Sequence, residues 1–79
     1  MTDVRIPAEI IDDGEGVISV WLFRDGETVA TGDVLAEVMN EKAVAELIAP
    51  ASGQLTILVS AEVPVKKDQL VARITALTT

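Results

Sequence analysis

The chain repeats one pattern of apolar and turn residues, and this repeat constrains its fold more than any other feature of the sequence. Residues 26–38 align with residues 62–74 at a constant offset of 36 (62 minus 26), with apolar positions on apolar positions. Just upstream, residues 16–20 align with residues 53–57 at an offset of 37 (53 minus 16). Because neither unit can bury its apolar face alone, the two are expected to cover one another. The repeat therefore predicts a flattened barrel or sandwich with quasi-twofold symmetry.

The side chains of both units favour β-strands. Hydrophobic residues make up 49% of the chain and aromatic residues only 3%, so the core must consist mostly of Val, Ile, Leu and Ala. Branched side chains pack well on a pleated surface, and no helical periodicity persists along the sequence. We therefore expect an all-β chain. The expected strands cover residues 4–6, 17–23, 34–39, 44–49, 55–59 and 70–74, with a short extended piece at 63–65.

Composition excludes several classes of function. The 79 residues suffice for one domain, 1–79, and a net charge of -7 opposes binding to nucleic acid or to anionic membranes. The chain has no cysteine and no histidine, which removes disulfides, thiolate metal sites, the commonest general base and the commonest neutral metal ligand. Serine has no histidine partner to activate it. We expect no catalytic residue and no metal site, and any chemistry must arrive with an attached group.

The sequence shows no targeting or membrane-spanning segment. No apolar run approaches the roughly 20 residues that span a bilayer. The first residues, Met1-Thr2-Asp3-Val4-Arg5, lack a basic region followed by an apolar stretch. A cytoplasmic location is the expectation, or the mitochondrial matrix if a presequence has been removed.

Residues 40–43, Asn-Glu-Lys-Ala, form a turn that joins the two halves of the repeat. An Asn at the first position of a type I turn can hydrogen-bond its own backbone, and the two central residues then need no glycine. The turn therefore places Glu41 and Lys42 at the exposed tip of a hairpin, with the chain termini expected at the opposite end. A solvated lysine without a special role is the simplest interpretation of Lys42 taken alone.

The setting of Lys42 resembles the lipoyl domains of 2-oxo acid dehydrogenase complexes. In that family the modified lysine commonly occurs as Asp-Lys-Ala at a hairpin tip, and glycines lie 16 residues before it and 11 after it. The resemblance covers about residues 6–74, and Trp21, expected to be a packing anchor, follows the Gly-Val-Ile type run as in the family. The matching residues at and around the tip are Gly26 (42 minus 26 is 16), Glu41, Lys42, Ala43 and Gly53 (53 minus 42 is 11).

The resemblance implies a fold, a cofactor and a set of partners. The fold is a barrel-sandwich hybrid of two four-stranded antiparallel sheets, and lipoate is attached covalently to Lys42. The implied role is a swinging arm that shuttles acyl groups and electrons. The recognition and hairpin context of Lys42 comprises Met39, Asn40, Glu41, Ala43, Gly26 and Gly53. The implied partners are the lipoylating enzyme, a thiamine-dependent 2-oxo acid decarboxylase, a dihydrolipoyl acyltransferase core and dihydrolipoyl dehydrogenase. The domain itself would be a non-catalytic carrier.

Two alternatives stay open beside this interpretation. Biotin carriers use the same fold with methionines directly flanking the lysine, whereas the neighbours here are Glu41 and Ala43. An unmodified barrel that only binds another protein is the second alternative.

Four residues depart from the family pattern. Met39 stands three before the lysine, where the family often has a Glu that helps the lipoylating enzyme, and Glu41 replaces the usual Asp. Glu62 and Asp68 stand where glycines are frequent in the second half.

Other acidic residues lie near the tip in sequence or in a turn. Glu37, Glu41 and Glu46 either guide a docking enzyme or form a solvated strand face. Asp12 and Asp13 precede Gly14 and Glu15, and this run is interpreted as a plain acidic turn because it lacks the spacing of a calcium loop.

Overall fold

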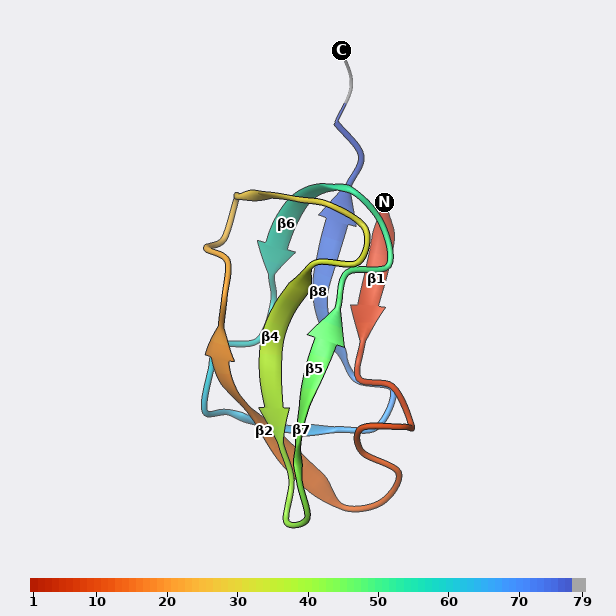
Figure 1. The fold of residues 1–79 in the computed structure, drawn as a ribbon, viewed down its shortest axis with the longest axis vertical. Helices are drawn as coiled ribbons and strands as arrows, with labels where there is room; N and C mark the ends of the chain where they lie inside the picture. Colours follow the sequence, from red (N-terminus) through yellow and green to blue (C-terminus); the bar gives the residue numbers. More distant parts are fainter. Residues whose placement is uncertain (78–79) are drawn as a thin grey trace.

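Eight short strands separated by turns make up the fold (Figure 1). The structure, a computed structural model, describes residues 1–77. In this part of the chain there is no helix long and apolar enough to cross a membrane. The strands are β1 (Thr2–Arg5), β2 (Glu15–Trp21), β3 (Thr28–Val29), β4 (Val34–Met39), β5 (Val44–Ile48), β6 (Gly53–Ile57), β7 (Pro64–Lys66) and β8 (Leu70–Thr75).

The strands form two four-stranded sheets in which every pairing is antiparallel. One sheet has the order β1-β8-β6-β3 and the other the order β5-β4-β2-β7. The sequence repeat superposes β2 on β6, β3 on β7 and β4 on β8, and each pair occupies the same place in its own sheet. The expected quasi-twofold architecture is therefore confirmed. Both sheets keep open edges, so the fold is a flattened barrel-sandwich without full closure.

Aliphatic side chains from both sheets fill the space between them. The buried side chains are Val, Ile, Leu and Ala, as the composition predicted, and no polar or charged residue is buried among residues 1–77. Trp21 and Phe23 lie half-buried against this core, and the Trp21 indole N–H donates to the Val59 carbonyl at 3.0 Å. The expectation that Trp21 anchors packing is thus confirmed. The buried residues are Val4, Ile6, Ile11, Ile18, Val29, Leu35, Ala36, Val38, Leu47, Ala49, Leu55, Val65, Val71, Ala72 and Ile74.

The sequence located six strands and the short extended piece, but it missed β3 and misplaced some ends. β3 has only two residues, too few to show the alternation that reveals a strand. β2 begins at Glu15 and ends at Trp21, two residues before the predicted end at 23. β6 ends at Ile57 rather than 59, because the backbone N–H groups of both Leu58 and Val59 turn toward the Val71 carbonyl.

The repeat extends to backbone conformation at two turns. Gly26 and Gly32 have φ of 90° and 93°, and the residues 36 positions later, Glu62 and Asp68, have φ of 71° and 63°. Positive φ is easy for glycine and strained for residues with a Cβ. The second half therefore keeps the turn geometry of the first half although it lacks the glycines.

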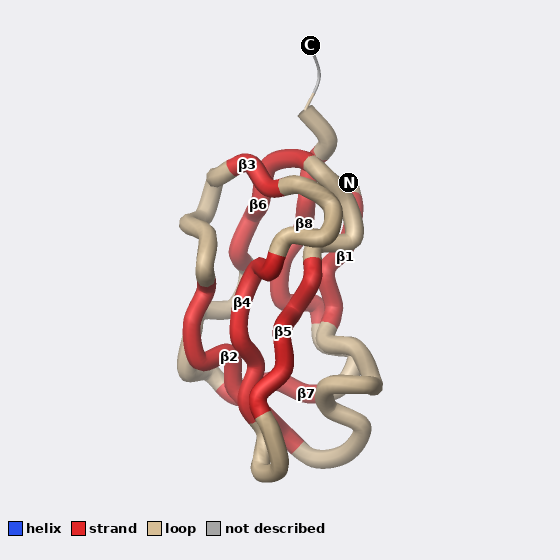
Figure 2. Tube along the Cα trace, in the orientation of Figure 1, coloured by secondary structure: helices blue, strands red, loops and turns tan. Residues whose placement is uncertain are grey.

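The two ends of the molecule differ in what they carry. The β4–β5 hairpin forms one end, beside the long β1–β2 loop, whereas β1 begins and β8 ends toward the other (Figures 1 and 2). Within the described residues, the hairpin therefore lies at the end opposite to the first and last strand ends, as predicted.

Candidate functional site

The β4–β5 hairpin ends in a loop of two residues, Glu41 and Lys42. Residues Met39 and Val44 are the last cross-strand partners, and beyond them the Asn40 N–H donates to the Ala43 carbonyl at 3.0 Å. Glu41, Lys42 and Ala43 are all exposed. Neither loop residue has a positive φ, as the expected turn requires. The structure therefore places Lys42 where the turn chemistry predicted, at an exposed hairpin tip.

Asn40 holds the backbone of this tip from both sides. Its Oδ1 accepts from the N–H groups of Lys42 at 2.8 Å and Ala43 at 2.9 Å, which is the self-capping expected of a turn Asn. Its Nδ2 donates to the Ile10 carbonyl at 2.7 Å, and Ile10 belongs to the β1–β2 loop. One half-buried side chain thus fixes the tip and fastens it to a second loop. The Lys42 backbone is held while its side chain is free to move.

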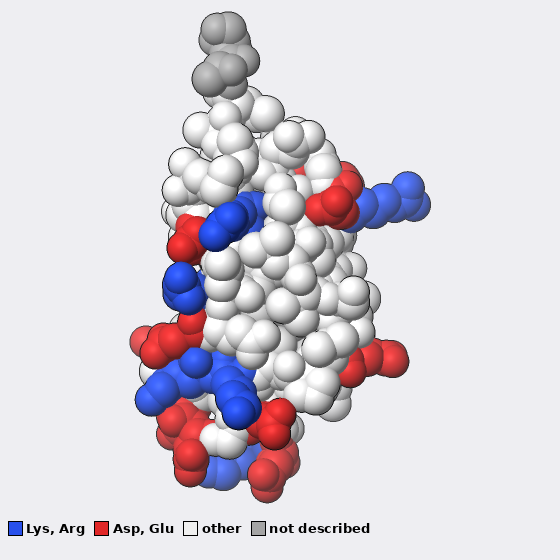
Figure 3. Space-filling model, turned by 180° about the vertical axis from the view of Figure 1, so that it is seen from behind, with Lys and Arg blue, Asp and Glu red and all other residues white. Residues whose placement is uncertain are grey.

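The acidic turn of the β1–β2 loop lies beside Lys42. The sequence did not predict this proximity, because Asp12 and Lys42 are 30 residues apart (42 minus 12). Figure 3 shows acidic side chains gathered around the hairpin end of the molecule. Residues of this turn and of the hairpin tip line one depression, called here the acidic hollow: Asp12, Asp13, Gly14, Glu15, Asn40, Glu41 and Lys42.

The acidic hollow sets the electrostatics around Lys42 without binding it tightly. The structure gives Lys42 no ion pair within 4.0 Å among residues 1–77, so its ammonium group is solvated within a negative field. In the same range no three His, Cys, Asp or Glu residues are placed to hold a metal ion.

Met39 is the last residue of β4 and lies on the outer face of its sheet. Its side chain is 43% exposed, next to Val17 of β2 and Val44 of β5. Two strand positions earlier, Glu37 of β4 stands directly opposite Glu46 of β5. This pair of like charges costs some sheet stability. Because side chains two residues apart on a strand share a face, both carboxylates lie on the same face as Met39, close to the hairpin.

Gly26 and Gly53 do not approach the hairpin, although they flank Lys42 at the family spacing. They lie near each other at the β3–β6 pairing, where Gly26 N–H donates to the Leu55 carbonyl and Val29 is opposite Gly53. A Cβ on Gly53 would overlap the Thr75 carbonyl group. Their interpretation as hairpin context is therefore corrected: Gly53 allows the close approach of β8 in the other sheet, and Gly26 supplies a turn with a φ of 90° beside that sheet.

Gly16 is the glycine that approaches the hairpin most closely, although the sequence indicated only that it is equivalent to Gly53 in the repeat. A Cβ at Gly16 would lie 2.5 Å from the Met39 carbonyl oxygen and 2.8 Å from Ile11 Cδ1. Gly53 makes the equivalent close approach to Thr75, which is the repeat counterpart of Met39 (75 minus 39 is 36). The repeat in the sequence carried this signal, because Gly16 and Gly53 are its equivalent positions.

Fold and site together define a small β-scaffold that offers one exposed lysine at a hairpin tip, beside a hollow lined by acidic residues. A family model described as "Biotin-requiring enzyme", which covers biotin and lipoyl attachment domains, matches residues 2–74. The chain therefore belongs to the biotin/lipoyl attachment family, and the likeness to lipoyl domains inferred from its sequence is confirmed.

Named relatives narrow the comparison further. The chain is 40% identical to the dihydrolipoyllysine-residue acetyltransferase component of pyruvate dehydrogenase complex from Staphylococcus epidermidis RP62A. Its identity to the same component from Staphylococcus aureus N315 is also 40%. Each alignment covers 68% of this chain and 14% of the relative, so the chain spans only a small part of those proteins.

Proposed function

We propose that the chain is a lipoyl carrier domain that receives lipoate in amide linkage on Lys42. The observation that carries this proposal is the geometry of the tip: an exposed lysine on a two-residue loop whose backbone is held by three bonds from Asn40. A fixed backbone presents the amine at one defined position to a modifying enzyme, while the lysine side chain keeps its freedom. Acylation of the amine removes one positive charge and changes the net charge from -7 to -8.

The residues at the tip fit lipoate better than biotin. The neighbours of Lys42 are Glu41 and Ala43, whereas biotin carriers have methionines at both positions. The relatives named above are dihydrolipoyllysine-bearing components, which supports the same choice. Nothing encloses the tip, so an attached arm has room to leave the surface. Lipoate would supply a reducible disulfide, a chemistry that this cysteine-free chain does not have.

The proposed partners come from the resemblance to lipoyl domains, and the relatives support them only in being components of a pyruvate dehydrogenase complex. They are the lipoylating enzyme, a thiamine-dependent 2-oxo acid decarboxylase, a dihydrolipoyl acyltransferase core and dihydrolipoyl dehydrogenase. The domain tethers the lipoyl group, so that this group is present at high effective concentration at the active sites of neighbouring enzymes. The acidic hollow contributes a negative field that favours partners with a basic entrance. Under this proposal the domain carries and the partners catalyse.

Intact mass measurement after incubation with lipoate ligase, ATP and lipoate tests the proposal. We expect one lipoyl increment on the parent chain and none on Lys42→Arg. Lys66→Arg and Lys67→Arg are matched controls, because both lysines are exposed like Lys42 but lie outside the hairpin. An increment that persists in Lys42→Arg would overturn the assignment. A parallel incubation with biotin ligase, followed by capture on streptavidin, separates the biotin alternative, and no increment with either enzyme indicates a protein-binding module.

A further inference from the structure

An exposed row of apolar side chains crosses the sheet at the base of the hairpin. Pro64 of β7 pairs with Val17 of β2, Val17 pairs with Met39 of β4, and Met39 pairs with Val44 of β5. Met39 is 43% and Val44 57% exposed, and none of the four is buried. We call these residues, Pro64, Val17, Met39 and Val44, the apolar row. It spans all four strands of the sheet, immediately beneath Lys42.

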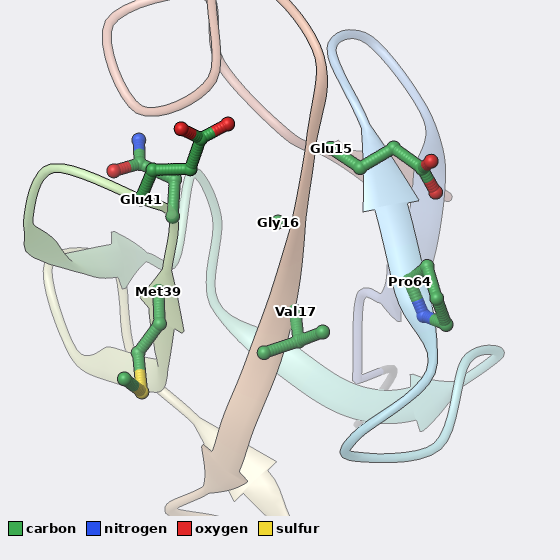
Figure 4. A pocket seen from close by; sticks show the side chains of 7 residues that line it. Glu15, Gly16, Val17, Met39, Glu41 and Pro64 are labelled. Carbon is green, nitrogen blue, oxygen red and sulfur yellow. The ribbon is translucent and has the colours of Figure 1, made fainter.

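The middle of the apolar row is hollowed. Figure 4 shows Val17 on the floor between Met39 on one side and Pro64 on the other, with Glu41 and Glu15 nearer the hairpin end. Gly16 has no side chain, so β2 approaches the Met39 carbonyl closely beneath the hollow. This apolar hollow is lined by Glu15, Gly16, Val17, Met39, Asn40, Glu41 and Pro64.

Two hollows of opposite character therefore meet next to Lys42. The acidic hollow and the apolar hollow share Glu15, Asn40 and Glu41, and Lys42 itself lines the acidic one. The free ammonium group of Lys42 is attracted to the carboxylates of the acidic hollow. Once the amine is acylated, this attraction is lost and the side chain becomes a long apolar chain. The apolar hollow then offers the favourable surface, because burial of apolar area drives association.

Met39 gives this chain the apolar wall. At this position the family often has Glu, which would place a charge at the edge of the hollow and keep it hydrated. The thioether side chain of methionine is flexible and polarisable, and it adapts to an irregular ligand. An apolar ligand in the hollow would thus explain both the departure from Glu at Met39 and the apolar character of the hollow.

We propose that the lipoyl arm on Lys42 rests in the apolar hollow between visits to partner enzymes, against Val17, Met39 and Pro64. This inference rests on the proposed function, since it requires the arm to be present. The tether keeps the arm close to the hollow at all times, so even a weak contact is populated. The hollow is open and shallow, so the arm can leave it when a partner offers a deeper site. The resting place shields the apolar arm from water and from unproductive contacts.

Nuclear magnetic resonance on the isotope-labelled chain, with and without the lipoyl group, tests this inference. Intact mass first establishes that the lipoyl increment is present. We then expect nuclear Overhauser effects between arm protons and the methyl groups of Val17 and Met39, together with shifts of the Val44 methyl signals. Shift changes limited to Glu41–Ala43, in a chain that carries the increment, would show a free arm and overturn the inference alone. Absence of the increment overturns the proposed function and this inference with it.

Variants locate the contact. Met39→Glu is expected to accept lipoate and to lose the contacts with the arm. Ile48→Glu is the matched control, since Ile48 is 45% exposed on the same sheet but at the far end of β5, and its contacts should persist. Val17→Thr, which keeps the branched shape, serves as the second variant and should weaken the same contacts. Contacts that survive both Met39→Glu and Val17→Thr contradict the proposed location, as do shifts of the apolar row that arise only when the lipoylating enzyme is added.

Discussion

Replacement of Asn40 by Ala is the sharpest test of how the hairpin tip is held. The substitution removes two bonds to the exposed N–H groups of Lys42 and Ala43, and one bond to the carbonyl of Ile10 in the β1–β2 loop. Water replaces the first two partners easily, whereas the contact with Ile10 is partly buried. At about 0.5–1.5 kcal/mol net for each bond, we expect a loss of about 2 kcal/mol in the free energy of unfolding.

Such a loss is large for a chain of this length. At 0.05–0.15 kcal/mol per residue, the 79 residues give a total stability of roughly 4–12 kcal/mol. Urea unfolding followed by the fluorescence of Trp21, the only tryptophan, measures it. With a denaturant slope of roughly 1 kcal/mol per molar, the midpoint should fall by about 2 M.

Two further variants separate the contributions. Asn40→Asp keeps the oxygen that accepts from Lys42 and Ala43, but its second oxygen would face the Ile10 carbonyl oxygen and its charge would join the acidic hollow, so a loss at least as large as that of Asn40→Ala is expected. Gln54→Ala removes one exposed side-chain bond, to the Gly26 carbonyl, at the other end of the molecule and should cost less than about 1 kcal/mol. If Asn40→Ala unfolds at the same midpoint as the parent chain, Asn40 does not hold the tip, and the argument for a rigidly presented Lys42 fails.

The remaining predictions concern glycine positions and their counterparts. Glu62→Gly relieves a residue held at φ 71° and should raise the melting temperature by about 3–6 °C, whereas Gly26→Ala, at the equivalent turn with φ 90°, should lower it by a similar amount. A calorimetric melt in which Glu62→Gly is less stable than the parent contradicts the strain argument. Gly53→Ala would place a Cβ 2.7 Å from a backbone carbonyl carbon of β8 and should cost about 3 kcal/mol, measured by urea unfolding. Gly14→Ala is its control, because open space surrounds that position and only its φ of 76° is unfavourable; equal losses for the two variants would contradict a steric cause.

The sequence by itself determined the architecture and the position of the lysine. The repeat at offset 36 assigns equivalent places to β4 and β8 in two sheets, because similar sequences make similar pairings. The turn at the hairpin tip could be predicted from Asn40 alone, because the Asn40 side chain binds backbone N–H groups only two and three residues further along the chain. The repeat is periodic and the turn is local, so both can be recognised in the sequence without knowledge of the tertiary structure.

Only the tertiary structure decided what surrounds the lysine. The acidic turn at 12–15 lies beside Lys42 because Asn40 binds Ile10, a contact between residues 30 apart. The apolar row depends on the register of three strand pairs, which no single segment of sequence specifies. The spacing also pointed to the wrong glycines, since Gly16, rather than Gly26 or Gly53, approaches the base of the hairpin at Met39. Close approach between strands is a property of pairs of segments, so it becomes visible only when the sheets are assembled.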